Sequence, residues 1–578
     1  AFVYEAEPLP TVDESLAALA GLSFDDFLFE SYRALFLRYP EWVVEYGLDE
    51  RFDYTEPVLT NVSEAFIEET ERLEQEVLVL LQSYDRAALP SDQQMSFDVY
   101  EYYLQSLVDA QQHRYLAFPV TFFILGSHSV QTQIFLQDNH PMENKEDALD
   151  YLYRLWAIET KFSQAMETLL IQEEMGIIPS KLILDWTIND LKGQARPKAN
   201  MTAYYKVLKD KLNEIDDMTV SESNEILLAA EEAIEQSVLP AYTEMITYLE
   251  SLLEKAPENG GLWQYEGGEA AYSYLLQKYT TTTLTADEIH QLGLSELERI
   301  HAEMRAVLTE LGYPEDADLG TLYQQMAPEG GSTGGPFLEE FYEQIIKKAE
   351  EDVKVAFDIL PEAKCDVIGG DKGAYYTPAA LDGSRPGAFY ANTTGGRWNY
   401  NTYSLTYHEA VPGHHTQIAL MQEMDLPLFR QIINFDAYAE GWALYAENLA
   451  DELGWYDDYL YGKLGMLEFQ ALRAARLVVD TGIHAKGWTY DEGVAFLMEN
   501  AMIPQGFAEY EAARYTVYPA QATSYMVGLL KILDLRQQVM DAQGDAFDIK
   551  EFHNVVLQNG ALPLDLLEAL IVEHYGLE

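Results

Sequence analysis

Residues 407–417, YHEAVPGHHTQ, contain three histidines and one glutamate. The histidines are His408, His414 and His415, and Glu409 directly follows the first of them. A zinc hydrolase needs neutral imidazoles as metal ligands and a carboxylate near the metal that takes a proton from water. The segment therefore holds the residue types that metal-dependent hydrolysis requires.

The spacing of these residues differs from that of the common HExxH motif, in which two histidines four residues apart share one helix face. On a regular helix, His414 would point about 120° away from His408. His415 would share the face of His408 but would lie about 10 Å further along the helix axis. Neither pair could hold one ion on an unbroken helix.

Pro412 and Gly413 lie between the histidines and can break the helix. Pro412 has no N–H to donate to the carbonyl of His408, and its ring disfavours helical conformation in the residue before it. Gly413 tolerates unusual backbone angles. A break would swing His414 back toward His408 and give an expanded motif, HExxxxH. The alternative is a helix that ends at the Pro-Gly pair and leaves surface histidines.

Glu440 is a candidate for the third ligand. It follows His414 at a separation that allows a loop and the start of a second helix, as in glutamate-type zincins. Small and aromatic neighbours, Trp442 among them, predict that Glu440 faces inward, where a metal would compensate the cost of burying a charge. The alternative is a core glutamate paired with an arginine. Glu447 is expected to support the site from outside or to lie on the surface.

Helical periodicity dominates the rest of the chain and predicts a mostly α fold. Residues 64–85 and 285–309 show it most clearly, with apolar side chains three, four and seven residues apart. Thr285 and Glu288 form a predicted capping box. Similar patterns occupy residues 148–174, 222–254, 337–358, 437–453, 464–480 and 521–542.

One strand is predicted at residues 388–392, after a Pro-Gly turn and shortly before the histidine segment. By this position it is expected to be an edge strand that pairs with an extended substrate through main-chain hydrogen bonds. Tyr390 and Asn392 would then line the substrate cleft.

Two Gly-rich stretches interrupt the helical pattern. The stretch at 257–268 predicts a boundary between an N-terminal helical half, residues 1–260, and a C-terminal half with the HExxxxH site, residues 261–578. The stretch at 328–336 lacks the Lys-Ser/Thr pair of a phosphate-binding loop, and no predicted strand precedes it. It is expected to be a flexible loop.

Composition excludes several classes of protein. The 578 residues include 36 Lys and Arg against 97 Asp and Glu, and the net charge of −61 argues against nucleic-acid or anionic-membrane partners. A hydrophobic content of 48% argues against general disorder. The single cysteine, Cys365, excludes internal disulfides and multi-cysteine metal sites. No apolar run is long enough to span a bilayer, and AFVYEAEPLP is not expected to be a signal peptide.

The motif HEAVPGHHTQ, followed by YAEGWALYAE, resembles the bacterial family of domain of unknown function 885. That family is grouped with the gluzincin-type zinc metallopeptidases and often consists of lipoproteins. The resemblance extends over residues 20–570. Other matching stretches are HQLGLSELERIHAEM at 290–304, YYTPAALDGSRPGAFYANT at 375–393, RLVVDTGIHAKGWT at 476–489 and RYTVYPAQATSYMVG at 514–528.

The resemblance implies a large helical, neurolysin-like zincin with a deep channel and a small β element next to the metal helix. His408, His414 and Glu440 would bind Zn²⁺, with His415 the rival for the second position, and Glu409 would be the general base. The resemblance also implies an extracellular or cell-surface location, with any signal segment or lipid anchor outside this chain.

The remaining roles follow from chemistry and chain order. Hydrolysis at a metal needs a hydrogen-bond donor for the oxyanion, and Tyr525 is favoured over Tyr518 for this role. Arg514 and Gln521 are expected to hold a carboxylate of a peptide, because Arg suits bidentate recognition of that group. Further candidates for substrate binding are Arg385, Arg397 and His484.

The leading hypothesis is a zinc-dependent peptidase that cleaves short peptides in an enclosed helical channel, as an oligopeptidase, dipeptidase or carboxypeptidase. One alternative is a zinc amidohydrolase that acts on a non-peptide amide. The other is a non-catalytic helical surface lipoprotein that binds peptides or another ligand. Glu409 beside His408 favours an enzyme, because a structural metal site has no need of a base.

Overall fold

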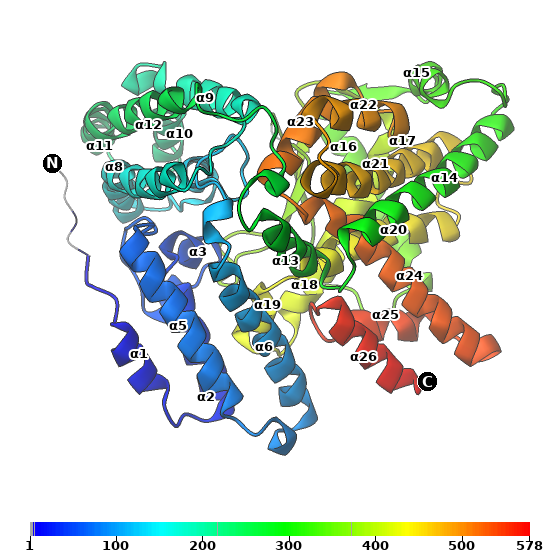
Figure 1. Cartoon of the computed structure of the whole chain (residues 1–578), viewed down its shortest axis with the longest axis horizontal. Helices are drawn as coiled ribbons and strands as arrows, with labels where there is room; N and C mark the ends of the chain where they lie inside the picture. The colour runs from blue at the N-terminus through cyan, green and yellow to red at the C-terminus, as the bar shows by residue number, and fades with distance from the viewer. Residues whose placement is uncertain (1–3, 5, 217, 372, 578) are drawn as a thin grey trace. The chain divides into compact units, whose positions relative to one another are not determined.

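The computed structural model describes residues 4, 6–216, 218–371 and 373–577. They fall into two compact units, unit 1 within residues 1–260 and 264–268 and unit 2 within 261–263 and 269–578. Unit 1 is blue to blue-green and unit 2 green to red in Figure 1. The division runs through the Gly-rich stretch where the sequence predicts a boundary. Among the described residues, no helix is both long and apolar enough to cross a membrane.

Unit 1 is helical. Its α-helices are α1 (Val12–Leu19), α2 (Phe24–Phe36), α3 (Pro40–Glu45), α4 (Asp49–Phe52), α5 (Glu64–Gln82), α6 (Ser91–Gln111), α7 (His128–Ile134), α8 (Lys145–Glu174), α9 (Lys181–Ala195), α10 (Ala203–Leu212), α11 (Val220–Ala233) and α12 (Leu239–Leu252). The apolar faces of α8 to α12 meet in one buried cluster that includes Leu155, Ile158, Tyr242 and Leu249. The helices predicted at 64–85, 148–174 and 222–254 are confirmed, the last with a π-helical turn between α11 and α12.

Unit 2 contains the histidine segment. Its α-helices are α13 (Gly268–Thr280, from its second residue), α14 (Ala286–Glu310), α15 (Leu319–Glu329), α16 (Pro336–Asp352), α17 (Asn399–Glu409), α18 (His414–Glu423), α19 (Leu428–Ile432), α20 (Asp436–Glu452), α21 (Leu460–Ala485), α22 (Tyr490–Asn500), α23 (Gln505–Val517), α24 (Ser524–Gln543), α25 (Ile549–Leu557) and α26 (Leu564–Tyr575). The predicted capping box is present at the start of α14, where Thr285 and Glu288 bond each other's backbone N–H. The fold is mostly α, as predicted.

Helix α21 runs through the middle of unit 2 and contacts α14, α17, α22 and α23. Most of its side chains are buried, and they include a stripe of polar residues at helical spacing. The members of this stripe are Arg473, Arg476, Asp480 and His484. Buried polar groups need partners, so the stripe must face other polar groups inside unit 2.

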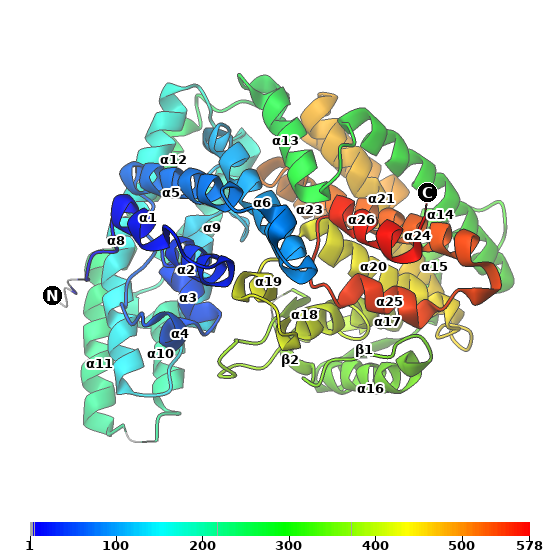
Figure 2. The same ribbon diagram turned by 90° about the horizontal axis from the view of Figure 1, so that it is seen from below.

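A three-stranded sheet, β2 (Asp366–Gly370), β3 (Tyr375–Thr377) and β4 (Ala388–Asn392), lies against α16 (Figure 2). Its order is β2-β4-β3, with β4 parallel to β2 and antiparallel to β3. The predicted strand at 388–392 is therefore confirmed, but its predicted position at a sheet edge is wrong. The short strands β2 and β3 lack a clear alternating pattern, and they cover both sides of β4.

The Gly-rich stretch at 328–336 is not simply a loop. Its residues Ser332–Gly334 form β1, which pairs antiparallel with β5 (Gly396–Trp398) just before α17. Gly334 stands opposite Gly396, where a Cβ would lie 3.1 Å from the Cα of Gly396. The missing side chain of Gly334 thus lets the two strands approach closely at this pair.

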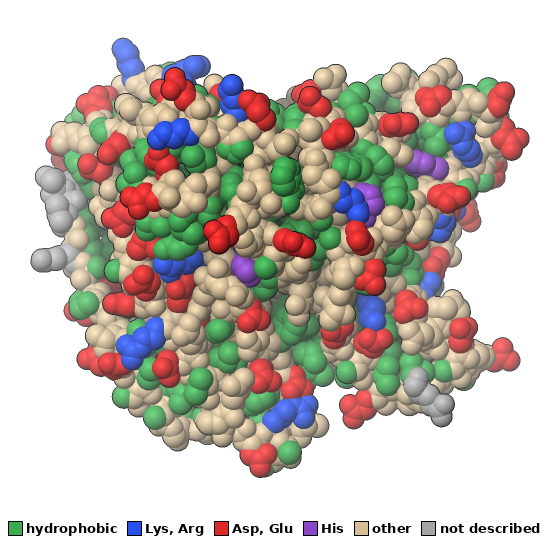
Figure 3. Space-filling view, in the orientation of Figure 1, with side chains coloured by type: hydrophobic (Ala, Val, Ile, Leu, Met, Phe, Trp, Pro, Cys, Tyr) green, Lys and Arg blue, Asp and Glu red, His purple; other side chains and the backbone are tan. Residues whose placement is uncertain are grey.

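Acidic side chains, in red, are scattered over the face shown in Figure 3 and do not gather in one patch. This distribution fits the large excess of Asp and Glu in the sequence. Net charge of this size favours solubility and adds self-repulsion to the folded state.

Helices α20 and α24 cross with almost no space between their backbones. At the crossing, Gly441 lies against Gly528, and a Cβ on either would overlap the other helix. For Gly528 the overlap is with the carbonyl oxygen of Ala437, which is backbone and cannot move aside cheaply. The close crossing fixes the start of α20, the helix that carries Glu440.

We expect Gly528→Ala to lower the free energy of unfolding by about 1–3 kcal/mol, because overpacking a tight contact forces backbone shifts. Denaturant unfolding followed by circular dichroism measures the change. Gly506→Ala is the matched control, since a Cβ there meets nothing within 4 Å, and it should be neutral or slightly stabilising. Equal stability of both variants would contradict the close crossing.

Candidate metal centre

The helix break predicted between the histidines is present. Helix α17 ends at Glu409, and α18 begins at His414. The backbone of Gly413 packs so closely on the carbonyl oxygen of His408 that any Cβ would overlap it. Gly413 has φ −76° and ψ −131°, so the close approach, more than a left-handed conformation, requires glycine here. Trp442 fixes the turn by donating from Nε1 to the carbonyl oxygen of Pro412 at 2.9 Å.

The break brings three candidate ligands together. The Nε2 atoms of His408 and His414 lie 3.4 and 3.3 Å from Oε2 of Glu440. The two imidazole rings meet edge to face, with centroids 4.8 Å apart. Within the described part of the chain, these residues are the one group of three His, Cys, Asp or Glu side chains whose ligand atoms all lie within 4.8 Å of one another.

One unsatisfied atom of this group fits a divalent cation. Oε2 of Glu440 is buried and has no hydrogen-bond partner among the residues that the structure describes, and it faces Nε2 of both histidines. Two imidazole nitrogens and one carboxylate oxygen form a donor set typical of catalytic zinc, which leaves a further position open. The side chains of His414 and Glu440 remain 13% and 18% exposed, so the site is reachable from solvent.

Glu447 orients the first ligand from behind. Its Oε1 lies 2.8 Å from Nδ1 of His408, and its Oε2 accepts a hydrogen bond from the hydroxyl of Ser404. With Nδ1 donating to Glu447, Nε2 of His408 presents its lone pair to the centre of the site. A carboxylate in this position is the usual partner of a metal-binding histidine. Both carboxylate oxygens of the buried Glu447 are engaged with His408 Nδ1 and Ser404, so Glu447 lies outside the group of candidate ligands.

The charges around the site favour a cation. Burial would lower the pKa of His408, but its contacts with the Glu440 and Glu447 carboxylates raise it to about 9. Burial alone would raise the pKa of Glu440, but the two histidines hold it well below its usual value. Protons and metal ions compete for the same imidazole nitrogens, so a site that attracts one also attracts the other.

Glu409 is placed for proton transfer. It follows His408 at the end of α17, and its side chain is buried. Burial raises the pKa of Glu409 above its usual value, while the charges of His408 and His414 oppose the rise. A carboxylate with a raised pKa is a better proton acceptor and donor near neutral pH than an exposed one.

His415 points elsewhere. Its Nδ1 lies 3.1 Å from the hydroxyl of Tyr376, and its Nε2 lies 3.1 Å from the carbonyl oxygen of Ala363. Both ring nitrogens are thus engaged in contacts with the segment that carries β2 and β3. Of the two rival histidines, the structure places His414 with His408 and Glu440.

Tyr525, at the start of α24, lies near the ligand group. Burial and then the charge of Glu440 raise its pKa, while a hydrogen bond with Arg514 opposes the rise. Arg514 also donates to Gln521 at 2.6 Å, and Gln521 donates to Asp436 at 3.1 Å. The structure thus brings together these residues, all predicted from the sequence apart from Asp436, around the first turn of α20.

Tyr518 lies at the edge of the same group. Its ring contacts that of Tyr279, with centroids 5.5 Å apart. Burial and then the charge of Asp436 raise the pKa of Tyr518 to about 12. Tyr518 is therefore a neighbour of Asp436, while the charge of Glu440 acts on Tyr525.

His484 has a structural role, and its prediction as a substrate-binding residue is wrong. It is 1% exposed, its Nε2 lies 2.9 Å from the carbonyl oxygen of Tyr515, and its Nδ1 accepts from the N–H of Leu262. Burial lowers the pKa of His484 to about 4. A buried neutral ring with both nitrogens bonded to backbone cannot reach a substrate.

The two residues expected to line an edge strand are also engaged locally. Tyr390 stacks on Tyr375 of the neighbouring strand, with ring centroids 5.2 Å apart. Asn392 donates to the carbonyl oxygen of Asp371 and accepts from Thr394. Because β4 is a central strand, its main chain is not free to pair with an extended peptide in the way the sequence predicts.

The rival arginines bond to their own surroundings. Arg385 donates to the carbonyl oxygen of Pro378, and Arg397 donates to Asn401. Two arginines not selected from the sequence, Arg473 and Arg476, lie over the ring of Tyr525 instead, at 5.8 and 4.6 Å from its centroid. Arg473 and Arg476 could have been found in the sequence as two charged residues three positions apart within an otherwise apolar helix.

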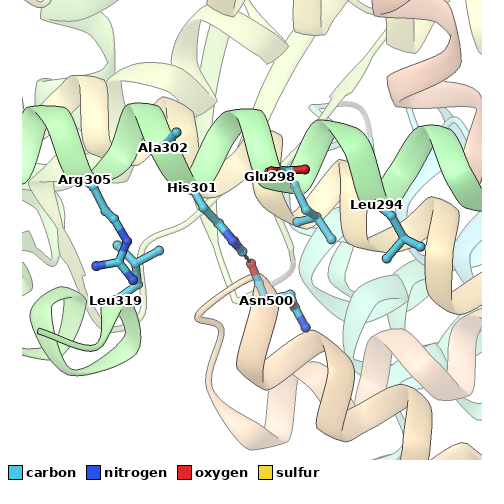
Figure 4. A pocket seen from close by; sticks show the side chains of 8 residues that line it. Leu294, Glu298, His301, Ala302, Arg305, Leu319 and Asn500 are labelled. Carbon is cyan, nitrogen blue, oxygen red and sulfur yellow. Dashed lines mark hydrogen bonds between the residues drawn. The ribbon is translucent and has the colours of Figure 1, made fainter. Parts of the chain in front are cut away.

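A separate hollow lies between α14, α15 and α22 (Figure 4). There His301 bonds the carbonyl oxygen of Asn500 at 2.7 Å, and Arg305 donates to the carbonyl oxygen of Ala317. Its remaining lining includes Leu294, and none of the three candidate metal ligands takes part in it. The hollow is therefore distinct from the metal centre.

Residues 40–571 match the family described as "Bacterial protein of unknown function (DUF885)". The chain therefore belongs to this family, as the sequence motifs predict. No curated protein is significantly similar to it in sequence.

Two solved structures share the fold. One, a "putative lipoprotein" from Colwellia psychrerythraea, has 27% sequence identity and a TM-score of 0.90, over 98% of this chain and 99% of that chain. The other, a "putative lipoprotein of unknown function" from Shewanella oneidensis, has 18% identity and a TM-score of 0.71, over 97% of this chain and 100% of that chain. The large helical fold is thus common to all three proteins.

We expect His414→Ala to lose bound zinc and His415→Ala to retain it, because Nε2 of His414 faces Glu440, while both ring nitrogens of His415 are engaged elsewhere. Elemental analysis of the purified proteins, after zinc is supplied, measures the metal content per chain. Zinc lost with His415→Ala and kept with His414→Ala would contradict this assignment.

We expect Glu447→Gln to weaken zinc binding by about 10–100-fold without changing any ligand, since the carboxylate orients His408. Competition with a chromogenic chelator measures the affinity. Glu452→Gln, on the same helix but paired with Arg536 at the surface, is the matched control. An unchanged affinity in Glu447→Gln would show that the contact with His408 does not support the metal.

Proposed function

We propose that this protein is a zinc-dependent metallopeptidase that hydrolyses short peptides. The observation that carries the proposal is the convergence of His408, His414 and Glu440, with Glu409 beside the first ligand. These residues would hold Zn²⁺ through Nε2 of each histidine and Oε2 of the glutamate. When bound, zinc supplies Lewis acidity, which polarises a carbonyl and makes water nucleophilic near neutral pH.

Glu409 would move the proton. Its carboxylate accepts a proton from the attacking water and then delivers it to the leaving amine as the C–N bond breaks. The raised pKa of Glu409, caused by burial, suits both steps. Because Glu409 directly follows His408, its carboxylate stays next to the ligand group whatever the position of the substrate.

Tyr525 would stabilise the negative charge that develops on the scissile carbonyl oxygen. A hydrogen-bond donor held in place before the reaction stabilises the transition state without a cost of reorganisation. The guanidinium group of Arg476 lies over the Tyr525 ring, and Arg514 forms a hydrogen bond with Tyr525. The electrostatic interaction of Tyr525 with Glu440 supports its place beside the ligand group.

The proposed location is the cell surface or the extracellular space. Support comes from the solved relative from Colwellia psychrerythraea, which is called a "putative lipoprotein" and matches nearly the whole of this chain. The net charge of −61 suits a soluble protein in a saline medium. Short peptides at the cell surface are the substrate class that the proposal names.

The test is Glu409→Gln, which keeps the shape of the side chain and removes the base. We expect hydrolysis of a mixed short-peptide library, followed by mass spectrometry, to fall by about 10²–10⁴-fold while zinc content stays unchanged. A wild-type protein that binds zinc and peptides but never cleaves them would contradict the peptidase and favour a binding protein. Cleavage of N-acyl amides alone would favour an amidohydrolase.

A further inference from the structure

Three arginines surround Tyr525 inside unit 2. Arg473 and Arg476 are 7% and 5% exposed, and their guanidinium groups lie over the Tyr525 ring. Arg514 bonds Tyr525 from another side. Glu511 pairs with two of them, at 2.7 Å from Arg476 and 3.2 Å from Arg514. Arg473 takes no part in this ion pair.

Some donors of this cluster have no partner. Nη1 of Arg476 and Nε of Arg473 are buried, and neither makes a hydrogen bond within the described part of the chain. Arg473 donates from Nη1 to the carbonyl oxygen of Phe469, at a long 3.5 Å. A buried cation without a hydrogen-bonded anion is costly, so these donors call for an external anion.

The neighbouring acids do not supply it. Burial raises the pKa of Glu468 and of Asp480 to about 7 each, so neither holds a full negative charge near neutral pH. Both carboxylate oxygens of Asp480 also accept from the N–H of Ala520, and one of them accepts from the hydroxyl of Tyr272. The excess positive charge stands out in a chain whose net charge is −61.

The cluster reaches the reacting groups. Arg473 interacts electrostatically with Glu409, and Tyr525 interacts with Glu440. These interactions, and the Tyr525 ring that Arg473 and Arg476 share, link the cluster to Glu409 and Glu440. Arg514, expected from the sequence to bind substrate, is instead engaged with Glu511 and Gln521.

We propose that Arg473 and Arg476 form a carboxylate-binding subsite next to the metal centre, so that the preferred substrates are short peptides with a carboxylate near the scissile bond. This inference rests on the proposed function, because it takes peptides to be the substrates. Binding of a carboxylate at the subsite can be measured without any hydrolysis. The carboxylate has two sources, the free C-terminus of a peptide and the side chain of an Asp or Glu.

The experiment measures binding by calorimetry to the zinc-loaded Glu409→Gln protein, which is not expected to turn the peptides over. The probes are two neutral tripeptides of one sequence, one with a free C-terminus and one with a C-terminal amide. A third probe is the amide with one residue replaced by Glu. We expect the free acid to bind at least about tenfold more tightly than the amide, because hydrogen bonds to charged groups are strong.

Arg473→Met, made in the Glu409→Gln background, should lower the affinity for the free acid to that for the amide and leave the amide unchanged. Arg536→Met is the matched control, since Arg536 also lies over a tyrosine ring, that of Tyr445, but pairs with Glu452. It should change neither affinity. Tight binding of the Glu-containing amide would show that the subsite also accepts the carboxylate of an acidic side chain.

The subsite is overturned if neither the free acid nor the Glu-containing amide binds more tightly than the neutral amide, and this comparison does not depend on the folding of any arginine variant. Hydrolysis by the wild type is measured separately on the same peptides. Cleavage of both with equal KM supports the peptidase and overturns the subsite. No cleavage, with the free acid still bound more tightly, supports the subsite and contradicts the peptidase.

Discussion

The structure of the metal centre depends on the close contact between the backbone of Gly413 and the carbonyl oxygen of His408. Without this contact, α17 would continue, and the second histidine would point away from the first. The contact turns the chain within four residues, and Trp442 of α20 holds the turn through the carbonyl of Pro412. The same helix α20 presents Glu440, so one element fixes both the turn and the third ligand.

The position of α20 depends in turn on its neighbours. Its N-terminal half crosses α24 backbone to backbone at Gly441 and Gly528, and α24 begins at the segment that carries Tyr525. Its later turns place Glu447 behind His408. The candidate metal ligands, Glu447 beside His408 and the candidate oxyanion donor therefore belong to one closely packed group of helices. Such packing holds side chains in place without the cost of ordering them when a ligand binds.

Much of this arrangement is predictable from the sequence, because it follows from local rules. The Pro-Gly pair predicts the break after Glu409, periodicity predicts the helices, and the apolar surroundings of Glu440 predict its burial. The strand partners of β4 and the pairing of Gly334 with Gly396 are not predictable, since short Gly-rich strands have no pattern. The structural role of His484 is not predictable either, because a polar residue inside an apolar helix can bond to the backbone of other segments. Arg473 and Arg476 lie on the same helix and contact Tyr525 of α24. Contacts between helices far apart in the chain cannot be predicted from residue spacing.

The most direct test of the metal centre is anomalous X-ray diffraction from crystals of the zinc-supplemented protein, with data collected on both sides of the zinc absorption edge. The structure predicts one strong anomalous peak, present only above the edge, within ligand distance of Nε2 of His408, Nε2 of His414 and Oε2 of Glu440. A peak beside His415, or no peak near these three atoms, would contradict the account.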